Sequence, residues 1–123
     1  MKKQYVLILI MILTLVGCNI KSISLTGESD SWGGEYTANI NGDKESGKFT
    51  FGYKNATGKE LNNLEITIND GKSVLKEGNY KGAIIEMPSS CSGCAVTNET
   101  MPIKVEIKWD DKEETFHLKT KDQ

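Results

Sequence analysis

Two cysteines, Cys91 and Cys94, offer the most reactive chemistry in the 123-residue sequence, and only Ser92 and Gly93 separate them. This spacing permits a disulfide, because a Ser-Gly spacer lets the backbone turn far enough to join the two sulfur atoms. We expect the disulfide in a domain that lies outside the cytoplasm, where no glutathione pool keeps thiols reduced. A closed loop of four residues contributes only about 2 kcal/mol to stability, so its role would be to shape the loop.

The same cysteine pair has two alternative uses, which the sequence leaves open. A thiol–disulfide exchange pair needs one thiolate of low pKa, usually at a helix N-terminus, whereas residues 95–98 are too few and too β-branched to predict a helix. A soft-metal site would add the thioethers of Met87 and Met101 to the two thiolates, a ligand set that suits Cu(I). A single C-x-x-C pair lacks the second pair that is typical of zinc sites.

The remaining polar residues match no catalytic motif. His117 is the single histidine, and because it alternates with Phe116 and Leu118 we expect it to point to solvent. A catalytic base would need a nucleophile and an orienting acid nearby, and the sequence contains neither Gly-x-Ser-x-Gly nor His-Glu-x-x-His. The acidic residues at positions 110–114 lack the alternating spacing of a calcium loop. The sequence therefore predicts a non-enzymatic protein without a cofactor.

One aromatic residue is a candidate for ligand binding. Trp32 is followed by Gly33 and Gly34, and small neighbours would leave its indole partly exposed, as in the anchors of binding surfaces. The alternative is a core tryptophan beside a bulge, which the two glycines would mark equally well.

The N-terminus has the order of a secretory signal, with Lys2 and Lys3 before an apolar run at residues 5–16. Twelve helical residues cover about 18 Å, less than the roughly 30 Å of a bilayer core, so we interpret the run as a signal helix rather than a membrane span. The ending Leu15-Val16-Gly17-Cys18 resembles the lipobox of bacterial lipoproteins. This resemblance implies removal of residues 1–17, a diacylglyceryl thioether on Cys18, and two acyl chains that anchor the protein to the outer face of the cell membrane.

Charge and composition limit the classes of molecule that the protein can be expected to bind. The precursor has 15 Lys plus Arg and 17 Asp plus Glu residues, and loss of Lys2 and Lys3 with the signal leaves 13 minus 17, or −4. A mild acidic excess argues against nucleic acid as a partner. Every one of these cations is a lysine, so the bidentate fork of arginine is missing. We expect the anchored protein to bind an envelope protein, a peptide or a wall component.

The mature chain has the length of one domain plus a tether. We assign residues 18–31 to the lipidated cysteine and a polar tether, and residues 32–123 to the ectodomain. Within the tether, Ile23 and Leu25 alternate with polar residues, a pattern that allows a short strand at a sheet edge.

From Trp32 onward, apolar side chains recur at every second residue, which is the pattern of half-buried β-strands. The alternating sets are Tyr36, Ala38 and Ile40; Phe49, Phe51 and Tyr53; Leu64, Ile66 and Ile68; and Ile103, Val105, Ile107 and Trp109, with Phe116 and Leu118 returning. We expect a further strand at residues 80–87 that Pro88 ends, a loop or short strand at residues 72–77, and a hairpin tip at residues 110–113. About seven short strands predict an all-β domain, an antiparallel β-sandwich with Ig-like topology as the default. A small β-barrel is the alternative.

Three stretches are the most distinctive parts of the mature chain. They are Gly27-Glu28-Ser29 followed by Trp32 and Tyr36, then Cys91-Ser92-Gly93-Cys94-Ala95-Val96-Thr97, and then Ile103 to Trp109 followed by the acidic turn and Glu114-Thr115-Phe116-His117-Leu118. Together they resemble a group of small uncharacterised lipoproteins of Bacillus and related Firmicutes. The resemblance implies an extracytoplasmic location and a β-rich ectodomain, and it brings no catalytic residue.

Overall fold

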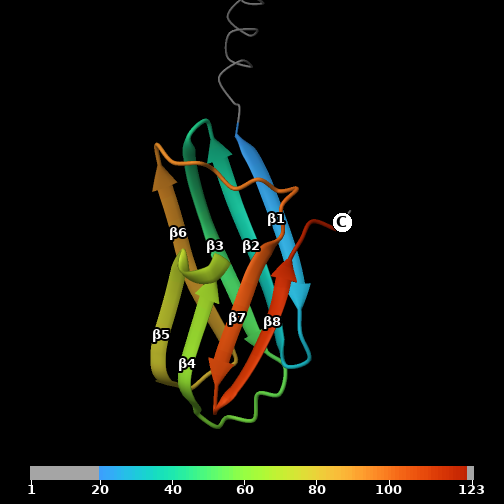
Figure 1. Ribbon diagram of the computed structural model, residues 1–123, viewed down its shortest axis with the longest axis vertical. Coiled ribbons are helices and arrows are strands. Elements are labelled where there is room, and N and C mark those ends of the chain that lie inside the picture. Colours follow the sequence, from blue (N-terminus) through green and yellow to red (C-terminus); the bar gives the residue numbers. More distant parts are fainter. Residues whose placement is uncertain (1–19, 122–123) are drawn as a thin grey trace, which may run out of the picture.

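The computed structural model describes residues 20–121, which form two packed four-stranded antiparallel sheets. One sheet has the order β1-β2-β3-β6 and the other β5-β4-β7-β8 (Figure 1). The strands are β1 (Lys21–Glu28), β2 (Trp32–Asn41), β3 (Lys44–Tyr53), β4 (Leu61–Ile68), β5 (Ser73–Tyr80), β6 (Ile84–Ser92), β7 (Ile103–Trp109) and β8 (Lys112–Leu118), with one 3-10 turn, η1 (Asn69–Gly71), after β4. This arrangement confirms the predicted β-sandwich. Residues 1–19, including the signal segment and Cys18, lie outside the described part of the chain.

The strand order departs from the Ig-like default. In an Ig sandwich the second and third strands belong to different sheets, whereas here β2 and β3 pair along their whole length, from Trp32 opposite Tyr53 to Asn41 opposite Lys44. Only Gly42 and one aspartate separate the two strands, and Gly42 takes a positive φ of 63°. A turn this tight leaves no chain to cross between sheets, so the two strands must pair.

The last hairpin has the same kind of turn. Trp109 pairs with Lys112, so the tip consists of Asp110 and Asp111 alone, with positive φ values of 46° and 60°. Two successive left-handed residues are typical of a type I′ turn, and aspartate tolerates this conformation. The tip is therefore two residues shorter than the predicted one at residues 110–113.

The inward faces of both sheets carry the alternating side chains that the sequence pattern predicts. The buried set is Ile23, Leu25, Trp32, Tyr36, Ala38, Ile40, Phe49, Phe51, Leu61, Leu64, Ile66, Ile68, Ile85, Met87, Ile103, Val105, Ile107, Trp109, Phe116 and Leu118. Phe51 meets Phe116 edge-on with ring centroids 6.4 Å apart, so aromatic pairs join the two sheets.

Three boundaries differ from the sequence prediction. β1 already begins at Lys21, and Ile23 and Leu25 are buried, so the domain includes most of the segment assigned to the tether. Of the predicted loop or short strand at residues 72–77, residues 73–77 belong to the longer strand β5. β6 continues through Pro88, because it is an edge strand, where a missing backbone N–H breaks no ladder on the open side.

The two sheets are joined at one side, between the first and the last strand. The Thr26 N–H donates to the Lys119 carbonyl at 2.8 Å, and the Lys119 N–H donates to the Thr26 carbonyl at 2.9 Å. Gly27 lies so close to β8 that an added Cβ would be 2.0 Å from the His117 carbonyl oxygen. Only glycine allows β1 to approach β8 in this way.

The antiparallel pairing gives the sandwich two distinct ends (Figure 1). At the β1 end, β1 begins, the β2–β3 turn reverses, and residues 93–102 connect β6 to β7. At the far end lie the loops of residues 29–31, 54–60 and 81–83 and the turn of residues 110–111.

Candidate functional site

The β1 end contains a buried carboxylate that the sequence analysis did not single out. Glu45 has the inward parity of Phe49 and Phe51 on β3 and is 8% exposed. It accepts hydrogen bonds from the Thr97 N–H and the Thr97 hydroxyl, both at 2.6 Å, and from the Tyr36 hydroxyl. A buried charge needs such donors, so Glu45 fixes the β6–β7 loop to the inside of the first sheet.

Both titratable groups of this cluster have shifted pKa values. Burial acts to raise the pKa of Glu45, but the hydrogen bonds from Thr97 and Tyr36 outweigh it and hold that pKa below its ordinary value of 4.5. Burial, together with the hydrogen bond and negative charge of Glu45, raises the pKa of Tyr36 to about 12. At neutral pH the pair is therefore a carboxylate and a protonated phenol.

Gly47 makes room for this pair. An added Cβ at position 47 would lie 2.5 Å from the Tyr36 hydroxyl oxygen and 2.8 Å from the Ala38 Cβ. The missing side chain therefore leaves the space through which Tyr36 reaches Glu45.

The cysteine pair lies directly beside the buried carboxylate. Cys91 is the cross-strand partner of Glu45, and its sulfur is at disulfide distance from that of Cys94, with the two Cα atoms 6.1 Å apart. The placement agrees with the predicted disulfide. The bond closes a small loop whose backbone turns at Gly93, which has a positive φ of 72°.

Two further contacts hold the β6–β7 loop at its ends. The Gly93 N–H donates to the Asp43 carbonyl at 3.0 Å in the β2–β3 turn, and Lys21 forms an ion pair with Glu99 at 2.7 Å. The loop is thereby tied to the start of β1 and to the neighbouring turn.

The structure does not bring together the four sulfur atoms of the alternative soft-metal set. Met87 is buried in the core opposite Phe49, four residues from Cys91 along an extended strand, or about 13 Å. Met101 is 63% exposed in the β6–β7 loop. The structure brings Cys91 and Cys94 together but not the two methionines, and within residues 20–121 no group of three or more His, Cys, Asp or Glu side chains is arranged to hold a metal ion.

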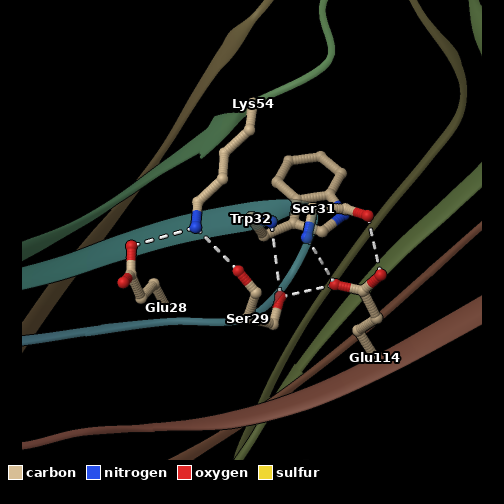
Figure 2. Close-up of polar contacts among 6 residues, drawn as sticks. All are labelled: Glu28, Ser29, Ser31, Trp32, Lys54 and Glu114. Atoms are coloured by element: carbon tan, nitrogen blue, oxygen red, sulfur yellow. Dashed lines mark hydrogen bonds and ion pairs between the residues drawn. The ribbon is translucent and has the colours of Figure 1, made fainter.

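The far end contains a second inward-facing carboxylate (Figure 2). Glu114, on β8, accepts hydrogen bonds from the Ser29 hydroxyl at 2.6 Å, the Ser31 N–H at 2.9 Å and the Ser31 hydroxyl at 2.7 Å. Lys54 donates to the Ser29 carbonyl at 2.8 Å and to Glu28 at 2.9 Å. The β1–β2 loop of one sheet is thus fixed to the second sheet.

Glu114 has a lowered pKa for the same reason as Glu45. Burial acts to raise its pKa, but hydrogen bonds from Ser29 and Ser31, with a contribution from the charge of Lys54, hold it below the ordinary value of 4.5.

Trp32 is fully buried, so the prediction of a partly exposed binding anchor is wrong. Its ring lies 5.6 Å from that of Trp109 and 5.0 Å from that of Tyr53. One of the two adjacent glycines serves the core: an added Cβ at Gly34 would be 3.0 Å from both the Phe116 and Phe51 rings, whereas one at Gly33 would meet no atom within 4 Å. Gly34 therefore admits other aromatic rings, and the glycines do not uncover the Trp32 indole.

A polar depression, which we call the far-end hollow, opens between the loops at this end, with a volume of about 700 Å³. Its lining consists of Tyr53, Asn55, Thr57, Lys59, Glu60, Leu61, Asn62, Asn63, Asn79, Asp110 and Asp111. These residues come from three separate stretches of the chain, residues 53–63, Asn79 and residues 110–111. The sequence analysis missed the hollow because no single segment contains its pattern.

His117 lies exposed on β8, as its alternation with buried Phe116 and Leu118 predicts. No helix among residues 20–121 has the length and apolar character to cross a membrane.

The two carboxylates connect residues of the three distinctive stretches of the sequence. Ser29 of the first stretch binds Glu114 of the third, and Tyr36 of the first stretch meets Thr97 of the second at Glu45. The stretches are therefore parts of two contacts that hold loops to the sandwich. No protein-family model, curated protein or solved structure matches the chain.

Proposed function

We propose that the protein is a lipid-anchored, non-catalytic binding module on the outer face of the cell membrane. The single observation that supports this most directly is the position of β1, which begins at Lys21, three residues after the lipobox cysteine Cys18. Three residues span at most about 11 Å. An anchor at Cys18 would hold the β1 end against the membrane.

The same geometry favours binding at the far end. β2 has ten residues, or about 33 Å at the rise of an antiparallel strand, so the far-end loops would stand well clear of the lipid surface. Loops that a rigid scaffold presents in this way are the usual location of binding residues.

The chemistry of the two carboxylates supports a non-catalytic role. A general acid or base works best with a pKa near the operating pH, whereas Glu45 and Glu114 have lowered pKa values. Their oxygens accept hydrogen bonds from loop residues, a structural use of the charge.

Expression of the full chain in a Gram-positive host tests the anchor. Intact mass spectrometry of the membrane fraction should find a chain that begins at Cys18 and carries a diacylglyceryl group and fatty acid. The Cys18→Ser variant should lack the lipid, while the matched Cys91→Ser/Cys94→Ser variant should keep it. An unlipidated wild-type chain in the cytoplasm would overturn the proposal.

A second candidate function uses the thiols of Cys91 and Cys94, for thiol exchange or for Cu(I) binding. The exposure of Cys91 favours it, because exposed disulfides are among the more easily reduced ones. Mass spectrometry of the native protein with and without reduction and alkylation separates the two functions. Stoichiometric copper, or a reduced pair in the native protein, would support the second function, and a stable disulfide without metal would exclude it.

A further inference from the structure

We infer that the far-end hollow binds an uncharged oligosaccharide. The inference rests on the proposed function, which turns this end of the sandwich away from the membrane. Four properties of the described residues support it: the kind of polar group, the net charge, one fixed aromatic ring and one side that is held in place.

Side-chain amides are the most frequent uncharged polar groups of the lining. Asn55, Asn62, Asn63 and Asn79 are four of the nine asparagines in the sequence, they come from the 54–60 loop, β4 and β5, and all four residues are exposed. Each amide holds a donor and an acceptor side by side. Neighbouring hydroxyls of a sugar ring also both donate and accept, so an amide can bind two of them at once.

The charge of the lining argues against an anionic ligand. Lys59 is the single cation against Glu60, Asp110 and Asp111, so one minus three gives a net charge of −2. Such a lining repels phosphate and sulfate groups, whereas carboxylates accept hydrogen bonds from neutral hydroxyls. A polar ligand without negative charge fits best.

One aromatic ring supplies a flat apolar surface. Tyr53 is half-buried, and its ring is fixed by Trp32 at 5.0 Å and by Trp109 at 6.0 Å. A ring that presents an apolar body beside polar groups suits a ligand of mixed character. The C–H face of a pyranose has this character.

One side of the hollow is held in place before any ligand binds. The Asn62 N–H donates to an Asp110 carboxylate oxygen at 2.8 Å, and the Asp110 N–H donates to the Asn62 carbonyl at 2.9 Å. The start of β4 and the β7–β8 turn are thereby joined. Preorganisation of this kind lowers the entropy cost of binding. The size of the hollow is also suitable, since its volume of about 700 Å³ lies within the roughly 300–1,000 Å³ that is typical of ligand sites.

The test uses the full-length protein in lipid nanodiscs and ligand-observed saturation-transfer NMR. The probes are N-acetylated chitotetraose and cellotetraose as uncharged oligosaccharides, and a heparin tetrasaccharide as the anionic one. We expect the wild type to bind an uncharged probe, and the Asn55→Ala/Asn79→Ala variant to bind it at least about tenfold more weakly, the effect of two lost hydrogen bonds.

The matched control is Asn39→Ala, which changes an exposed asparagine of β2 that bonds to Ser22 and does not line the hollow. It should bind like the wild type. Failure of both uncharged probes, preference for the heparin probe, or unchanged binding by the Asn55→Ala/Asn79→Ala variant would each overturn the inference. Binding does not require the lipid: a wild-type chain that the Gram-positive host leaves unlipidated in the cytoplasm, but that still binds the sugar, would overturn the proposed function and leave the site intact.

Discussion

At the scale of single residues, the two inward-facing glutamates carry the polar contacts that close the sandwich. Glu45 and Glu114 lie at opposite ends of the sandwich. Glu45 accepts hydrogen bonds from the β6–β7 loop, and Glu114 accepts them from the β1–β2 loop. Both could have been suspected from the sequence, since each breaks the apolar parity of its strand: Glu45 shares a face with Phe49, and Glu114 with Phe116.

The Glu45→Gln variant tests the buried contact. Glutamine has one acceptor oxygen and no charge, so at least one donor of the cluster loses its acceptor and the remaining hydrogen bonds are no longer charge-assisted. We expect the free energy of unfolding to fall by about 2 kcal/mol, the usual worth of hydrogen bonds to a charged group, measured by urea unfolding. Glu35→Gln, on the exposed face of β2, should change stability by less than about 0.5 kcal/mol. Equal effects of the two substitutions would contradict the role of Glu45.

Removal of the disulfide is the second prediction at this scale. The Cys91→Ser/Cys94→Ser variant should lose about 2 kcal/mol or less, since the closed loop contains only four residues. The same urea titration measures the change. A variant that fails to fold would show that the cysteine pair holds more of the structure than its own loop.

At the scale of elements, the alternation of apolar residues predicted the pairing faces but not every strand boundary. β5 was not predicted as a full strand because it is an edge strand, mostly exposed, and only Leu75 and Tyr80 of its residues pack against the core. The continuation of β6 past Pro88 depends on its edge position, which the local sequence does not reveal. The far-end hollow forms only where three separate stretches of the chain meet, so it depends on the topology and not on a local pattern.

Two glycines of β3 provide a matched test of how the elements pack. Gly47→Ala places a Cβ against the Tyr36 hydroxyl, and we expect a loss of about 1–3 kcal/mol from overpacking and from displacement of Tyr36. Gly52→Ala meets no atom within 4 Å and should be neutral or stabilising, since alanine restricts the unfolded chain. Thermal unfolding of the two variants compares them directly, and a Gly47→Ala variant as stable as the wild type would refute this account of Tyr36.

At the scale of the whole molecule, carboxylates of lowered pKa at both ends couple stability to acid. The unfolded chain has the ordinary carboxyl pKa of 4.5, whereas the pKa values of Glu45 and Glu114 are lower in the folded protein. As the pH falls, the unfolded chain takes up protons first, and the free energy of unfolding decreases. The contribution of the two glutamates to stability is fully present above the unfolded pKa of 4.5, and it is lost as the pH falls through their lower folded pKa values.

The Glu45→Gln/Glu114→Gln variant measures this coupling. Its free energy of unfolding should fall less steeply than that of the wild type as the pH drops below about 4.5, in urea titrations at a series of pH values. Parallel curves for the two proteins would show that other carboxyls dominate acid unfolding.

The hydrogen bonds between Thr26 and Lys119 join the first strand of the sandwich to the residue that follows the last. A chain that emerges from a ribosome or an export channel with its N-terminus first releases these two segments at opposite ends of the process. β1 must wait for β8 before the two sheets can be joined, and contacts of such large sequence separation form slowly. The order of the strands therefore delays the joining of this side of the sandwich until nearly all of the chain has been delivered.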